Sequence, residues 1–188
     1  MGIAMEPLRL QLRTLLNDKL AADDVAGAHP DNVEQLLTLV ALTEPLQQLL
    51  RFRLATVTSL IEEVRTAFTG RLNLFSSSFV GSPSNIWMEG LSLPAMRSTP
   101  DIFHLLAYSA DTGVVNSDLT FCLSQIGDPG RLNLTLNLGL PITPTLGHAL
   151  AKVEFARRQG VRRFAFFNYG FLGEARLNWV KTIAQALG

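Results

Sequence analysis

The chain has a single cysteine, and what it lacks excludes several classes of protein. Cys122 stands alone among 188 residues, so neither an intramolecular disulfide nor a cysteine-based zinc site is available. The charge is balanced, with 16 basic and 16 acidic residues and no Lys/Arg patch, which argues against a nucleic-acid partner. No apolar run approaches the roughly 20 residues of a membrane span, and no signal-peptide pattern is visible. We expect a cytoplasmic protein without a membrane partner, an expectation that weakens if the true amino terminus is missing.

Sequence motifs that identify common enzyme classes are also missing. There is no P-loop, no G-x-S-x-G elbow, no H-E-x-x-H pair and no G-x-G-x-x-G turn, nor a Ser-His-Asp order. The sequence therefore predicts neither a cofactor nor a metal site.

What the chain does have is four strand-like runs that recur about every 30 residues. They are RLNLFSSSF from Arg71, DIFHLLAY from Asp101, RLNLTLNL from Arg131 and RRFAFFNYG from Arg162. A strand with its crossover helix takes about 30 residues and places the next strand parallel to the last. Four such units predict an α/β fold with a parallel sheet, which is half of the eight units of a (β/α)8 barrel.

The helical patterns divide the chain into a helical segment over 1–69 and four strand–helix units over 70–188, which together form one partial barrel domain. A long helix from Thr43 ends at Gly70, directly before the first strand, and so reads as a crossover helix whose own preceding strand is absent. The stretch 94–98 is too short for a long helix. Further helices are expected over 6–22, 31–42, 112–126, 145–159 and 174–187.

Alternation along the strands predicts which side chains point into the barrel. The leucines of RLNLTLNL must meet helices, which sends the residues between them inward. The inward set is Asn73, Phe75, Ser77, His104, Tyr108, Asn133, Thr135 and Asn137. In the fourth strand the alternation leaves open whether Asn168 or Tyr169 points inward.

A polar barrel interior has two interpretations, which differ along the strands. The deeper residues fit a hydrogen-bonded core network. Residues near the carboxyl ends of the strands lie where barrel enzymes carry their active sites, so they are candidates to face a ligand. These candidates are Ser77, Tyr108, Asn137 and Asn168.

Few acids follow the strands. Glu89, beside Trp87 in the loop SNIWMEG, is the better candidate for catalysis, and Asp111 in YSADTG is the second, although it also fits a helix cap. Trp87 and Tyr108 are suited to stacking on a sugar ring. Glycoside hydrolysis usually takes two carboxylates across the bond, and nothing in the spacing fixes the distance between these two.

Several segments resemble a known family. LLRFRLATVTSLIEEVRTAF, WMEGLSL, AYSAD and GVRRFAFFNYGFL are similar to the carboxyl-terminal half of uncharacterised glycoside-hydrolase-like (β/α)8 proteins, which resemble sugar-processing barrels including the beta-galactosidase-like group. The resemblance covers Leu8 to Gly188. It implies that the four strands correspond to the fifth to eighth of a barrel, without the first four and any acid they carry. It also implies a substrate-side wall of Trp87, Glu89, Tyr108, Asn168 and Tyr169.

The leading hypothesis is thus the carboxyl-terminal half of a barrel enzyme that hydrolyses a glycosidic bond, with a carbohydrate as its partner. One alternative is an aldolase or isomerase barrel, but Lys19, Lys152 and Lys181 all fall in predicted helices rather than on strands. The other is a non-catalytic half-barrel that associates with itself through its two open sheet edges.

Overall fold

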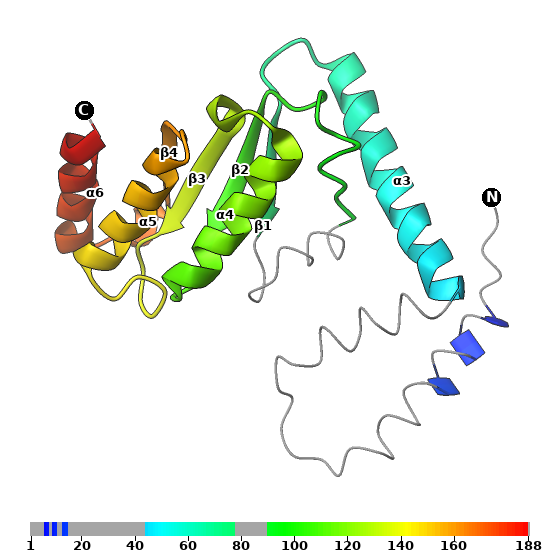
Figure 1. Ribbon diagram of the computed structural model, residues 1–188, viewed down its shortest axis with the longest axis horizontal. Helices are drawn as coiled ribbons and strands as arrows, with labels where there is room; N and C mark the ends of the chain where they lie inside the picture. The colour runs from blue at the N-terminus through cyan, green and yellow to red at the C-terminus, as the bar shows by residue number, and fades with distance from the viewer. Residues whose placement is uncertain (1–5, 8, 11–12, 15–43, 78–89, 188) are drawn as a thin grey trace. The chain divides into compact units, whose positions relative to one another are not determined.

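The computed structural model describes residues 6–7, 9–10, 13–14, 44–77 and 90–187 (Figure 1). The chain separates into two units, Met1–Thr56 and Val57–Gly188. In the first unit the described residues are helical and include the amino-terminal part of α3 (Glu44–Ala67). The predicted helix 31–42 lies outside the described residues, as does most of the predicted helix 6–22.

The second unit is built on a four-stranded parallel sheet, which confirms the predicted α/β fold. Its strands are β1 (Asn73–Ser77), β2 (Ile102–Ala107), β3 (Leu132–Asn137) and β4 (Arg163–Phe167). They lie in sequence order, and each pairs in parallel with the next. This is the order that successive right-handed strand–helix units produce.

Three helices follow the strands at the positions that the sequence predicts. They are α4 (Thr112–Ile126), α5 (Leu146–Arg158) and α6 (Glu174–Leu187). Thr145 caps α5 by accepting a hydrogen bond from the His148 amide nitrogen, and Gly127 ends α4 in the left-handed conformation at φ 79°. Between β1 and β2 the described residues form turns rather than a helix, in agreement with the short crossover expected there.

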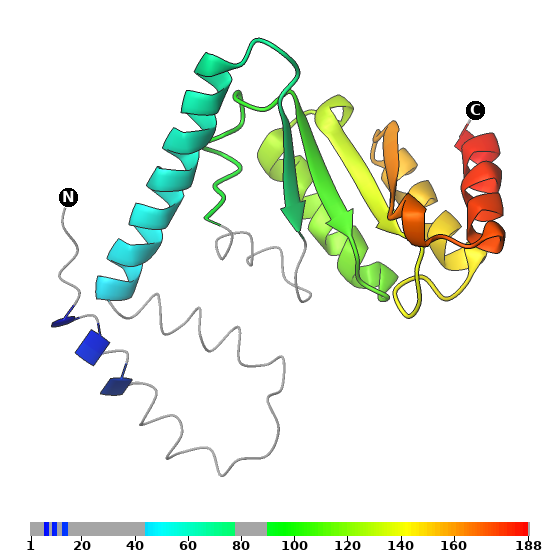
Figure 2. The same cartoon turned by 180° about the vertical axis from the view of Figure 1, so that it is seen from behind.

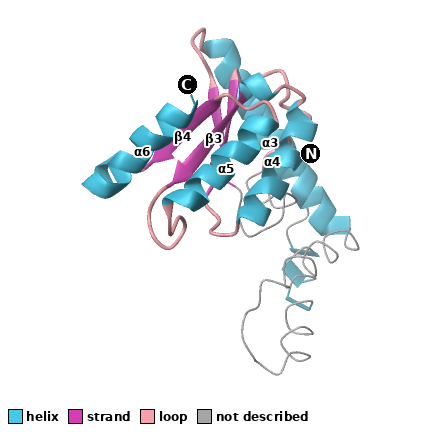
Figure 3. Cartoon of the chain, turned by 60° about the vertical axis from the view of Figure 1, so that its left-hand side comes forward, coloured by secondary structure: helices cyan, strands magenta, loops and turns pink. Residues whose placement is uncertain are grey.

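The sheet buries one face against these helices (Figure 3). The alternate leucines of β3, Leu132, Leu134 and Leu136, have essentially no exposed surface, because they lie between the sheet and the helix layer. Asn133, Thr135 and Asn137 point to the opposite face, as alternation predicts. Figure 2 shows this opposite face with the strands in front of the helices.

One carboxylate ties the amino ends of two strands to α3. Asp101 Oδ2 accepts hydrogen bonds from the Leu72 amide nitrogen at 2.7 Å and from the Arg65 guanidinium at 2.8 Å. The backbone N–H of Leu72, and then the charge of Arg65, hold the pKa of Asp101 below its ordinary value. The Asp101 carboxylate thus links the residue before β1 to the residue before β2 and to the end of α3.

Candidate functional site

Three side chains from neighbouring strands meet at the carboxyl edge of the sheet. Asn137 at the end of β3 is in register with Phe167 at the end of β4, and Leu136 is in register with Ala107 of β2. Tyr108, directly after β2, therefore stands level with Asn137 and Phe167. The rings of Tyr108 and Phe167 approach to 5.5 Å between centroids at 33°, so two aromatic faces flank the amide at this edge.

The loop after β3 fixes Asn137. Its Oδ1 accepts a hydrogen bond from the Gly139 amide nitrogen at 2.8 Å, and its backbone oxygen accepts one from Thr143 Oγ1 at 2.6 Å. Arg176 of α6 donates to the Thr143 backbone oxygen at 2.7 Å and stacks over Trp179 at 3.8 Å. Since the Asn137 oxygen is occupied, its Nδ2 hydrogens are the donors that this side chain offers to a ligand.

The loop that carries Tyr108 is held from the helix layer. Lys152 of α5 has no exposed surface, and its Nζ donates to the Ser109 backbone oxygen at 2.7 Å. Burial raises the pKa of Tyr108 above its ordinary value of 10.0, so the phenol is neutral at physiological pH and can both donate and accept.

A second polar group lies deeper on the same face. Asn133 Nδ2 donates to His104 Nδ1 at 2.9 Å, with Thr135 Oγ1 at 3.5 Å from the same ring nitrogen. Phe75 of β1 stacks on the His104 ring with centroids 4.2 Å apart. Burial lowers the pKa of His104 below 6.5, which favours the neutral ring. Since Nδ1 accepts from Asn133, the ring proton lies on Nε2. These deeper residues form the hydrogen-bonded network that the sequence suggests.

The predicted acids do not join this edge within the described residues. Asp111 lies at the amino end of α4, where its Oδ1 accepts a hydrogen bond from the Gly113 amide nitrogen at 2.7 Å. That geometry is the helix cap considered above as its alternative role. Glu89 and Trp87 lie outside the described residues, as does the side chain of Ser77, the residue that ends β1.

The fourth strand ends before the other predicted residues. The Phe167–Asn168 peptide bond is cis, and Asn168 leads into the short helix η3 (Tyr169–Phe171). Tyr169 is 75% exposed. Asn168 and Tyr169 therefore follow the site along the chain, but the inward residue of this strand is Phe167.

Sequence reasoning missed two residues here. Phe167 was missed because polar and apolar residues do not alternate regularly in its strand. The register with β3 would have identified it, because the residue opposite Asn137 must point to the same face. Lys152 gave no signal, because a lysine in an amphipathic helix is normally exposed.

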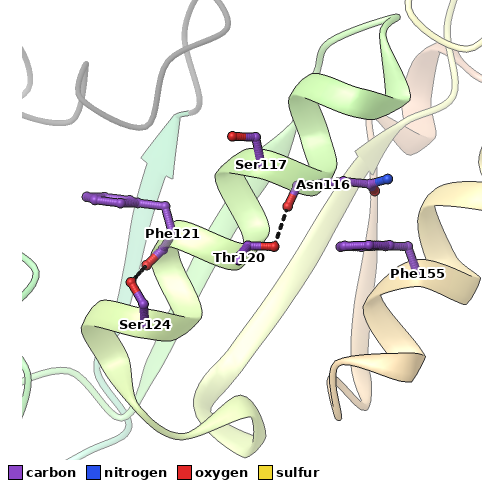
Figure 4. A pocket seen from close by; sticks show the side chains of 6 residues that line it. All are labelled: Asn116, Ser117, Thr120, Phe121, Ser124 and Phe155. Carbon is purple, nitrogen blue, oxygen red and sulfur yellow. Dashed lines mark hydrogen bonds between the residues drawn. The ribbon is translucent and has the colours of Figure 1, made fainter.

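A hollow on the outer side of the helix layer is the other recess that we considered (Figure 4). Its wall is formed by α4 residues and Phe155 of α5. Thr120 donates to the Asn116 backbone oxygen and Ser124 to the Phe121 backbone oxygen, so both hydroxyls are used within their own helix. The hollow has no charged lining residue, and it offers less chemistry than the carboxyl edge.

Other kinds of site find no support in the part of the chain that the structure describes. Cys122 is buried, and desolvation together with nearby Asp118 raises the pKa of its thiol to about 12, which leaves it unreactive. Within the described ranges no cluster of metal-ligating side chains occurs, and no helix there is long and apolar enough to cross a bilayer.

Comparison with known proteins adds no relative: no family model, curated protein or solved structure matches the chain. The class of protein therefore rests on the fold itself, a parallel α/β sheet whose carboxyl edge carries the Tyr108–Phe167 ring pair.

Proposed function

We propose that the chain is the sugar-binding half of a glycoside-hydrolase-like barrel and that it binds a carbohydrate at the carboxyl edge of its sheet. The observation that carries the proposal is the Tyr108–Phe167 ring pair beside the Asn137 amide. Aromatic rings cover the apolar face of a sugar, while amide and phenol groups bond its hydroxyls. The three described side chains, Tyr108, Asn137 and Phe167, are uncharged, which suits an uncharged ligand better than a phosphate or a carboxylate.

The reaction we propose for this site is hydrolysis of a glycosidic bond, with Glu89 as the acid–base candidate. The resemblance to sugar-processing barrels supports this reaction, and the cap geometry of Asp111 makes Glu89 the stronger candidate of the two. Since such hydrolysis usually takes two carboxylates, the second must come from outside the described edge.

Binding of methyl glycosides, followed by titration calorimetry, tests the proposal. We expect Tyr108→Ala to weaken binding at least about tenfold, because about 1.4 kcal/mol of stacking and hydrogen bonding is lost. Tyr108→Phe keeps the ring and should lose less. Phe52→Ala is the matched control, since Phe52 is an exposed aromatic residue of α3 and not of the sheet.

Two outcomes would overturn the proposal. Absence of binding to every glycoside tested would remove the sugar site, and equal loss in Tyr108→Ala and Phe52→Ala would place it elsewhere. Hydrolysis is tested separately with nitrophenyl glycosides, where turnover that survives Glu89→Gln would remove Glu89 from the mechanism.

A further inference from the structure

One face of the sheet has no helix over it in the described part of the chain (Figure 2). Parallel sheets occur almost only with both faces covered, yet Phe75 is 58% and Phe167 46% exposed on this face. Asn133 is nine-tenths buried on the same face, and its Oδ1 has no hydrogen-bond partner there. An unpaired buried acceptor costs about 1–3 kcal/mol. The face therefore has the character of a surface that another body covers.

The two edges of the sheet match one another. β1 and β4 are five residues long, and within the sheet each pairs with one neighbour. Since all four strands run in the same direction, an outer strand parallel to β4 can have the direction and length of β1. Four strands are half of the eight that close a (β/α)8 barrel, so a second identical sheet completes the ring.

We propose that a second copy of this chain covers the open face and that the two copies close one eight-stranded barrel. In this dimer β4 of each copy pairs with β1 of the other, about a twofold axis along the barrel. Phe75, His104 and Asn133 of both copies then lie inside, and the carboxyl edge becomes a rim lined by both. The inference does not depend on sugar binding and fails separately from it.

An exposed apolar row on α3 supports this occupant. The predicted apolar stripe of α3 divides in the structure: Val57 and Ile61 pack against the core, whereas Val64 and Phe68 are about half exposed, in line with Leu60. The spacing of Leu60, Val64 and Phe68 places them on one side of the helix. Ring closure brings α6 of the second copy next to the helix that precedes β1, which is α3.

The exposed area is of the right order for a stable dimer. Five half-exposed apolar side chains take part: Leu60, Val64, Phe68, Phe75 and Phe167. At roughly 100 Å² each, they offer roughly 500 Å² per copy before the strand edges are counted. A standard interface takes about 800 Å² per partner, and backbone pairing along β1 and β4 supplies much of the difference.

Light scattering coupled to size exclusion tests the proposal on the full chain. We expect a discrete dimer of twice the 20.6 kDa chain mass. Phe75→Glu should weaken dimerisation by about a hundredfold or more, because it buries two unpaired carboxylates. Phe171→Glu is the matched control, since Phe171 is 88% exposed in η3, which follows the end of β4; it should leave the dimer intact.

A substitution on α3 provides a second test that does not affect the core. Val64→Glu should raise the dimer dissociation constant at least a few-fold, because it places a carboxylate in the proposed apolar contact. A wild-type chain that stays monomeric would overturn the proposal and assign the open face to another occupant. Undefined aggregates, or a dimer indifferent to both Phe75→Glu and Val64→Glu, would also overturn ring closure.

Discussion

At the scale of single residues, Lys152 is the most constrained group of the molecule. The side chain has no exposed surface, and its hydrogen bond to the Ser109 backbone oxygen fixes the loop that carries Tyr108. Burial lowers the pKa of Lys152 below 10.5. Because the buried Lys152 amine donates a hydrogen bond to a backbone oxygen, it positions the loop. It offers no support for an enzyme that forms a Schiff base.

The stability of the chain should therefore depend on Lys152 and pH together. The folded state releases this proton at a lower pH than the unfolded state, so stability rises with pH up to 10.5 and falls as pH drops through the folded pKa. Within that window the gain is at most about 1.4 kcal/mol per pH unit. Urea unfolding of the wild type and Lys152→Met across alkaline pH measures it; parallel curves for the two proteins would refute the effect.

At the scale of elements, the helix boundaries follow from short-range chemistry. The amino ends of α4 and α5 are capped by the side chains of Asp111 and Thr145, residue types that favour this position. The carboxyl end of α4 is formed by Gly127, whose left-handed conformation favours glycine. Each of the three helices after the strands consequently begins and ends close to its predicted residues.

Replacing Asp111 separates its capping role from catalysis. Asp111→Ala should lower the free energy of unfolding by about 1 kcal/mol, because the Gly113 amide nitrogen loses its acceptor, whereas Asp111→Asn should lose little. Thermal unfolding of both variants measures this. If Asp111→Asn abolished glycoside turnover with stability unchanged, the carboxylate would be catalytic and our interpretation of Asp111 as a cap would be wrong.

The fold was accessible from the sequence because strand alternation and helix caps are local signals. Alternation in RLNLTLNL correctly assigned Asn133, Thr135 and Asn137 to one face. The Tyr108–Phe167 contact spans two strands that are not neighbours, and the Lys152–Ser109 bond joins residues 43 apart. Such contacts depend on packing between units, for which the sequence carries no local signal.

At the scale of the whole sheet, the two faces carry different kinds of side chain. One is an apolar core against α4, α5 and α6, and the other combines a polar network with exposed aromatic rings. In the described part of the chain the helices after the strands cover one face, and our two proposals concern the other face and its carboxyl rim. The proposed dimer and the proposed sugar site share Phe167 at the carboxyl rim and otherwise use different levels of that face.

The most direct test of the sugar site is nuclear magnetic resonance of the labelled wild-type chain titrated with a methyl galactoside. We predict that saturable shifts gather at Tyr108, Asn137 and Phe167, with none in the hollow around Thr120. Shifts confined to the helix layer, or none at all with any methyl glycoside, would contradict the account.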